Sequence, residues 1–174
     1  ATVGFDGFDQ GFKAVAEMFS LGLRPTLVDL TEERGAHGVG VLLYMMYEGY
    51  KEGVSARRRR SLQVCSSFGG KDLGAKESLE YWRERYSTGE WYRREMLNQP
   101  RSVRWRRPGG SFEYLHLALP VSRVLDYRRS CEEVLRRHGV SVREYAIWTQ
   151  PELFSMLLVP SRETADTSSD GLAQ

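Results

Sequence analysis

The feature that most constrains the fold is an order of predicted elements that occurs twice along the 174 residues. Each half reads strand, helix, strand, strand, helix, and a glycine (Gly22 or Gly139) follows the first helix of each half and can end it. Such a unit folds as an antiparallel sheet with helices packed on one face, because both kinds of element must bury an apolar side. We therefore predict an α+β protein with a ferredoxin-like fold, built from two βαββα-type halves.

Apolar periodicity places the elements of the first half. The predicted order is a strand over residues 2–5, a helix over 8–21, strands over 26–30 and 39–47, and a helix over 50–68. The first helix carries apolar residues at steps of three and four, which gives it one apolar stripe. Pro25 forbids further helix and favours extension. The run over 39–47 is apolar throughout, which is typical of a central strand.

The second half repeats the pattern after a basic connecting segment. We predict a strand over residues 112–119, a helix from 124 to Gly139, strands over 140–149 and 153–159, and a final helix within the polar residues 161–174. The connection from Lys71 to Gly110 is rich in Arg and Trp and poor in strand signal, so we expect one or two helices and a loop there.

Composition excludes several classes of protein. With 41% hydrophobic residues the chain has enough apolar material for a core, so it is not a disordered polymer. A net charge of +2 is not typical of a nucleic-acid binder, and the longest apolar run is too short to span a membrane. Cys65 and Cys131 fall in helical apolar stripes, which favours buried free thiols in a reducing, cytoplasmic location.

No self-contained catalytic set is present, so we assign no catalytic residue and no metal ligand. His37, His116 and His138 are far apart, and no Cys or His spacing is typical of a metal site. His138 stands at a predicted helix end, where a cation is favoured by the helix dipole. No phosphate-binding glycine motif occurs.

Arginine is the unusual residue, with 21 Arg against 4 Lys. Arg57–Arg60 falls in the long helix and is typical either of solvated side chains whose stems cover the sheet or of a docking surface for an acidic partner. A second cluster combines Trp82, Arg85 and Tyr86 with Trp91 and Arg93. Guanidinium groups between aromatic side chains can grip a carboxylate or phosphate. The same composition also suits a surface helix with Glu84 and Glu90 as ion-pair partners.

The order of these motifs resembles a known family. The matching pieces are Gly22-Leu23-Arg24-Pro25 after the first helix, Tyr47-Glu48-Gly49 after the central strand, Phe68-Gly69-Gly70 with Gly74, Trp82-Arg83-Glu84-Arg85-Tyr86, and Trp91-Tyr92-Arg93. Together they span roughly Phe5 to Val159. The chain resembles the C-terminal, substrate-side cap domain of FAD-linked oxidases of the vanillyl-alcohol oxidase superfamily, which includes D-lactate dehydrogenases, glycolate oxidase subunits and alkyldihydroxyacetonephosphate synthase.

The resemblance implies a part of an FAD-dependent oxidoreductase that acts on a small anionic substrate, either a 2-hydroxy acid or a phosphate-bearing compound. It implies that Arg93 and Arg85 face the anion, and Trp82, Tyr86 and Trp91 would form the walls. Glu48 and Gly49 end a central strand, where backbone can approach a ligand closely, and they are candidates for facing the flavin. The partner would be the FAD-binding domain of the parent protein, with no nucleic acid and no membrane span.

The sequence also departs from the family pattern. Residues 1–174 would form a single cap domain that lacks the FAD-binding domain and the C-terminal His motif of the family, so the chain alone would be catalytically incomplete. Phe154 stands where the phosphate-ester branch has a tyrosine acid. The alternative from another class is a non-catalytic ferredoxin-like module that binds a protein or a small effector through its sheet.

Overall fold

A computed structural model describes residues 1–35, 38–100 and 112–160 of the chain. The expected helix within 161–174 and the end of the connecting segment, residues 101–110, lie outside the described residues. In chain order the elements are β1 (Thr2–Phe5), α1 (Phe8–Ser20), β2 (Leu27–Gly35), β3 (Gly38–Met46), α2 (Lys51–Ser67), β4 (Lys71–Gly74), α3 (Lys76–Glu84), α4 (Ser87–Trp91), the π-helical turn η1 (Tyr92–Met96), β5 (Glu113–Ala118), the 3-10 turn η2 (Val121–Arg123), α6 (Val124–Arg137), β6 (Val140–Trp148) and β7 (Leu153–Pro160).

All seven strands form one antiparallel sheet in the order β4-β1-β3-β2-β6-β7-β5. The first four strands have the 4-1-3-2 order of a complete ferredoxin-like unit, and β5, β6 and β7 repeat the places of β1, β2 and β3. The equivalent strands β2 and β6 pair with each other antiparallel, so a pseudo-two-fold axis through the sheet relates the two halves. The predicted α+β, ferredoxin-like fold is confirmed, and the order strand, helix, strand, strand occurs in both halves of the described residues.

One strand was missing from the prediction for the connecting segment. Lys71–Gly74 forms β4 and pairs with β1, although a helix or loop was expected there. The four residues have little strand propensity of their own and are mostly exposed. Their strand conformation comes from the free edge of β1, which offers unpaired backbone groups.

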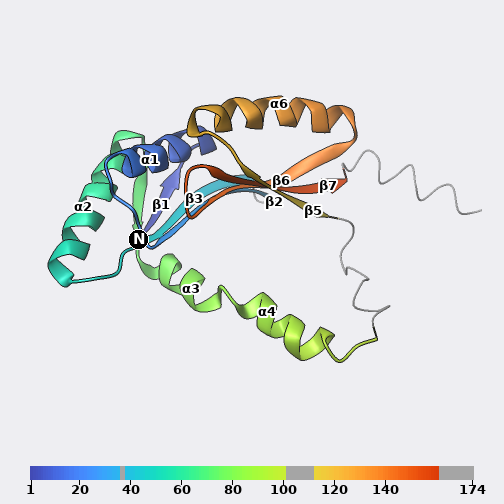
Figure 1. Cartoon of the computed structure of the whole chain (residues 1–174), viewed down its shortest axis with the longest axis horizontal. Coiled ribbons are helices and arrows are strands. Elements are labelled where there is room, and N and C mark those ends of the chain that lie inside the picture. The colour runs from blue at the N-terminus through green and yellow to red at the C-terminus, as the bar shows by residue number, and fades with distance from the viewer. Residues whose placement is uncertain (36–37, 101–111, 161–174) are drawn as a thin grey trace, which may run out of the picture.

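The helices of the two halves, α1, α2 and α6, cover one face of the sheet, whereas α3 and α4 lie on the opposite side (Figure 1). The core lies between the sheet and the covering helices, and its largest fully buried side chains include Phe8, Met18, Leu30, Leu43, Tyr145, Ile147, Phe154 and Met156. A Cβ on Gly11 of α1 would come within 2.6 Å of the Leu30 side chain, so a glycine lets this helix approach β2 closely.

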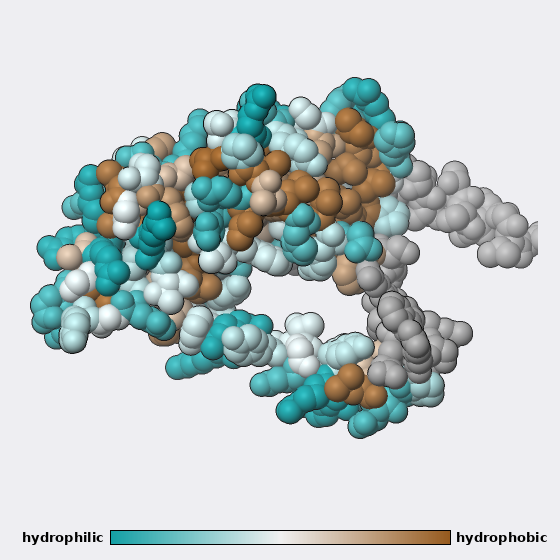
Figure 2. All heavy atoms as spheres, viewed as in Figure 1, coloured by the Kyte–Doolittle hydropathy of each residue, from teal (hydrophilic) through white to brown (hydrophobic). Residues whose placement is uncertain are grey.

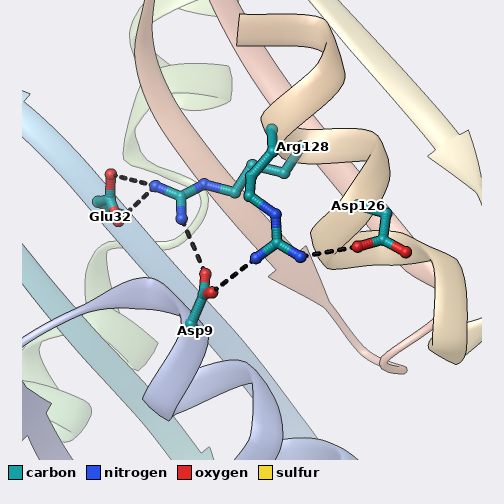
Figure 3. Close-up of polar contacts among 5 residues, drawn as sticks. Asp9, Glu32, Asp126 and Arg128 are labelled. Carbon is teal, nitrogen blue, oxygen red and sulfur yellow. Dashed lines mark hydrogen bonds and ion pairs between the residues drawn. The ribbon is translucent and has the colours of Figure 1, made fainter.

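A buried ion pair joins the two halves beneath α6 (Figure 3). The guanidinium of Arg128, on α6, donates two hydrogen bonds to the Glu32 carboxylate of β2 at 2.9 and 3.0 Å. It donates a third to Asp9 of α1 at 3.1 Å. The side chains of Arg128 and Glu32 are only 13% and 4% exposed. The pair therefore ties α1, β2 and α6 together inside the core.

Both cysteines are free thiols, as the sequence predicted. Cys65 is buried on α2, and burial raises the pKa of its thiol to about 12, so it stays protonated and unreactive at neutral pH. Cys131 on α6 is half-buried. Among the described residues, no helix has the length and apolar character that a bilayer crossing requires.

Candidate functional site: the open sheet face and the arm beside it

The sheet face opposite α1, α2 and α6, here called the open face, is lined by alternate residues of each strand. On β2, Leu30 and Glu32 point to the helices, so Asp29, Thr31 and Glu33 lie on the open face, since side chains alternate along a strand. The pairing of β2 with β6 then places Trp148, Ala146 and Glu144 beside them, opposite Asp29, Thr31 and Glu33 respectively.

An arm of helix, comprising α3, α4 and η1 (Lys76–Met96), leaves this face at one end. Only α3 contacts the sheet closely. The hydroxyls of Ser78 and Thr2 share a buried hydrogen bond of 2.7 Å. The Tyr81 hydroxyl donates to Asp29 at 2.5 Å, and the Tyr81 ring stacks on Tyr44 with centroids 4.7 Å apart. Beyond α3 no described residue of the arm is buried, and Figure 2 shows a hollow between the arm and the sheet.

Aromatic side chains form a row across the second half of the open face. Tyr114 stacks on His116 at 5.6 Å between centroids, and His116 contacts Trp148 at 5.1 Å. Phe112 meets the edge of the row at 6.0 Å from Tyr114. Tyr114 and Trp148 remain 42% and 38% exposed. Exposed aromatic rings that contact one another make this row a candidate binding surface.

Carboxylates lie on the central strands between this row and Tyr81. Burial raises the pKa of Asp29, and the charge of Glu33 adds to that rise, although the hydrogen bond from Tyr81 opposes it. Burial likewise raises the pKa of Glu144, with Glu33 and Asp29 adding to the rise and Arg143 opposing it. The middle of the open face is therefore acidic, with its carboxylates repelling one another.

The sequence-predicted anion clamp lies on the arm. The Arg85 guanidinium lies over the Trp82 ring at 3.5 Å and over Tyr86 at 4.4 Å, and it donates to the Trp82 carbonyl oxygen. These three residues form one group at the end of α3. Trp91 and Arg93 follow on α4 and η1 and are exposed. The structure thus brings Trp82, Arg85 and Tyr86 together and leaves Trp91 and Arg93 further along the arm.

The candidates Glu48 and Gly49 follow the end of β3 and are exposed, with the Arg57 side chain beside them. The Arg57 guanidinium donates to the Glu48 carbonyl oxygen at 3.3 Å. The same group lies 3.3 Å from where a Cβ on Gly49 would be, and Gly49 has a φ of +129° that favours glycine. Arg57–Arg60 are all exposed, which fits both solvated side chains and a docking surface.

Phe154 does not lie on the open face. Its ring is 1% exposed and packs in the core against Phe8 and Tyr145, with centroids 6.1 and 6.0 Å away. Ser155, the next residue of β7, lies on the open face instead, where it pairs with His116 of β5 and Ala146 of β6. The residue expected in the place of a family tyrosine therefore has a packing role.

Sequence reasoning missed the open face itself. The alternation of Asp29, Thr31 and Glu33 with Leu30 signals a strand with one polar face, but nothing local indicates that Glu144 and Trp148 lie beside them. That neighbourhood depends on the pairing of β2 with β6 across more than 100 residues. Among the described residues, no group of His, Cys, Asp and Glu is placed to hold a metal ion.

Comparison with known proteins bears on the fold. No protein-family model and no curated protein sequence matches the chain. Two solved structures of alkyldihydroxyacetonephosphate synthase, in P1 and P212121, are similar over 97% of this chain, with TM-scores of 0.62 and 0.63 and sequence identities of 11% and 10%. At this identity the similarity shows a shared fold. The chain corresponds to 38% and 36% of the length of those two chains.

Proposed function

We propose that residues 1–174 form the substrate-side cap domain of an FAD-dependent oxidoreductase that acts on a small anionic substrate. The observation that carries the proposal is the shared fold with alkyldihydroxyacetonephosphate synthase over 97% of the chain. It agrees with the order of motifs from Gly22 to Arg93, which was identified without the structure. FAD would be held mainly by a separate domain of the parent and would supply the redox chemistry when bound.

The open face suits a surface that covers a flat ring system. Its row from Tyr114 to Trp148 is exposed and stacked, and Thr31 and Ala146 between the aromatic groups are small. The hollow in Figure 2 leaves this face accessible next to the arm. Glu48 and Gly49 remain candidates for facing the flavin, although a ligand there would have to share the place with Arg57.

The charges of the two surfaces support an anionic substrate on the arm rather than on the sheet. Asp29, Glu33 and Glu144 would repel a carboxylate or phosphate on the sheet. On the arm, Arg85 is held by the rings of Trp82 and Tyr86, which orient a guanidinium and limit the water around it. Arg93 is exposed further along the arm and would be a second contact for the anion. Free thiols at Cys65 and Cys131 support a cytoplasmic parent.

The test is Arg93→Ala in the full-length parent. Loss of one charge-assisted contact to an anion costs about 1.5–3 kcal/mol, which corresponds to an increase in KM of about 10- to 100-fold. The matched control is Arg94→Ala, because Arg94 is the adjacent residue and already pairs with Glu95 at 2.7 Å. FAD content should stay normal in both variants.

Unchanged kinetics in Arg93→Ala and in Arg85→Ala would remove the clamp from the proposal. The coding sequence on either side of this segment tests the broader claim. An FAD-binding domain upstream and a His motif downstream would support the cap assignment. A parent that lacks both would favour the alternative, a non-catalytic ferredoxin-like binding module.

A further inference from the structure

We propose that the outer edge of β5 pairs with β5 of a second copy of this chain, so that two sheets join into one across a two-fold axis. β5 is the last strand of the sheet, and among the described residues only β7 pairs with it. The proposal does not depend on the proposed enzymatic function, because the oligomeric state of this chain tests the pairing, whereas the kinetics of the parent test the enzymatic function.

The first support is a set of backbone groups directed to that edge. The amide of Leu119 donates to the carbonyl oxygen of Glu152 at 2.9 Å, on the side of β7. Alternate residues of an antiparallel strand direct both of their backbone groups to the same neighbour. By this alternation Tyr114, His116 and Ala118 direct their N–H and C=O groups to the outer edge. None of the three is a proline, so each has both groups to offer to another strand.

The second support is that β5 lacks the devices that protect an edge strand from pairing. At the opposite edge of the sheet, β4 has only four residues, carries Lys71 and Asp72, and pairs with β1 through a register that shifts between Thr2 and Val3. Short length, charge and irregularity are common protections of an edge. β5 has six residues in regular register with β7, contains no lysine or proline, and carries one charge, on Glu113. Such an edge is a template for another strand.

The third support is the incomplete cover of β5 on the helix side of the sheet. In the first half of the chain β1 has the equivalent place, and its residues Val3 and Phe5 are 1% and 7% exposed beside β4. Leu115 and Leu117 of β5 point to the same side, since they pair with buried residues of β7, but they are only half-buried. A strand beyond β5 would cover these leucines, and burial of apolar surface favours that pairing.

A second copy fits this edge because the strand is complementary to itself. Directly opposed residues share a face of the sheet, so the two-fold axis of an antiparallel β5 pair passes through a residue. With the axis at Leu115, Tyr114 of each copy lies opposite His116 of the other copy, on the open face. The same two rings already stack within one chain, with centroids 5.6 Å apart. Aromatic pairs across neighbouring strands stabilise a sheet.

This pairing stops at two copies. It uses the β5 edge of both copies, and the edges that remain are those of β4, which are short and charged. With the axis at Leu115, Glu113 lies opposite Leu117 of the second copy, so the charges of the two β5 strands do not oppose each other. An interface that uses the same patch on both subunits gives a closed dimer, whereas two different patches could produce a fibre.

The experiment is sedimentation equilibrium of the 174-residue chain. We expect a monomer–dimer equilibrium with a Kd of about 10 µM, at the weak end of specific interfaces. His116→Pro removes an outward N–H without removing a hydrogen bond to β7, and edge strands accept proline at such positions. It should weaken dimerisation about tenfold or more. His116→Ala is the matched control, because it keeps the N–H, and it should weaken dimerisation less than His116→Pro.

A disulfide tests the position of the axis. Leu115→Cys, in a Cys131→Ser background, places a thiol of each copy at the axis, where the facing Cα atoms of such a pair lie about 4.5 Å apart. A disulfide spans this separation, so mild oxidation should give a covalent dimer. Leu117→Cys in the same background is the control. It lies on the same face of β5 but two residues from the axis, and it should not cross-link.

Three outcomes would overturn the proposal. The chain could remain monomeric up to about 1 mM, which would mean that something other than a second copy covers the edge. His116→Pro could dimerise as well as His116→Ala, or Leu117→Cys could cross-link as readily as Leu115→Cys. If His116→Pro fails to fold, His116→Lys takes its place, because a lysine on an edge strand opposes pairing and should weaken dimerisation by a similar factor.

Discussion

Arg128→Met should destabilise the protein strongly, because it removes the cation that compensates a buried carboxylate. Glu32 is 4% exposed in its side chain and accepts two hydrogen bonds from Arg128, at 2.9 and 3.0 Å. Removing one partner of a buried ion pair costs about 3–5 kcal/mol, since the remaining charge stays desolvated. The guanidinium also lies over the rings of Phe8 and Tyr145, at 4.8 and 4.4 Å from their centroids.

Equilibrium unfolding in urea measures this effect. With a slope of about 2 kcal/mol per molar urea, the midpoint should fall by about 2 M. Arg129→Met is the matched control, because Arg129 is adjacent, contacts the same Asp9 at 3.3 Å and is 60% exposed. Exposed ion pairs contribute about 0–1 kcal/mol, so its midpoint should hardly move.

The double variant Arg128→Met, Glu32→Leu separates the charge from the packing. It removes the buried carboxylate together with its Arg128 partner, so it should be more stable than Arg128→Met alone. The reasoning would be refuted if Arg128→Met lost less than about 1 kcal/mol, or if Arg129→Met were equally damaging. Either result would mean that the Glu32 carboxylate is hydrated or otherwise compensated without Arg128.

Two further predictions concern the attachment of the arm. Tyr81→Phe removes the hydroxyl that donates to Asp29 but keeps the ring stacked on Tyr44, so it should lower the free energy of unfolding by about 1–3 kcal/mol and speed hydrogen exchange in α3. Tyr86→Phe, at an exposed position, is the control and should change neither quantity. Equal exchange rates in the two variants would contradict the role of the Tyr81 hydroxyl in attaching α3. Burial raises the pKa of Asp29 above its ordinary 3.8, so the folded state binds this proton more tightly than the unfolded state does. The free energy of unfolding therefore falls as the pH rises through the pKa of Asp29 in the folded state. Asp29→Asn cannot ionise, so its stability relative to the wild type should improve between about pH 4 and neutral pH in urea unfolding; a difference that is constant with pH would show that Asp29 is not desolvated.

Local sequence patterns predicted most of the elements. The apolar stripe of α1, the glycines after α1 and α6, and the uniformly apolar β3 each carry a signal within about twenty residues. The predicted boundaries of these elements differ from the observed ones by one or two residues. β2 is longer than expected. Its second half is polar and gives no apolar strand signal, but it is held as a strand by pairing with β3 and β6. β4 was missed for the related reason that only its partner β1 makes it a strand.

The candidate site was predictable only in part. Aromatic and arginine composition indicated the group of Trp82, Arg85 and Tyr86, because residues three or four apart on a helix meet without help from the rest of the fold. The acidic middle of the open face was not predictable, because it combines Asp29 and Glu144 from different halves. The side of β7 on which Phe154 lies was not predictable either, because it depends on the register of the pairing, and a shift of one residue exchanges the two faces.

Order along the chain, which periodicity and glycine positions encode locally, was enough to establish a duplicated α+β fold. The tertiary structure decides which side chains share a face of the sheet. It does so by pairing β2 with β6, the equivalent strands of the two halves, about a pseudo-two-fold axis. That pairing buries Glu32 against Arg128 on one side of the sheet and gathers Asp29, Glu33 and Glu144 on the other. The physical reason is that strand register is a long-range property, fixed by burial across the whole sheet.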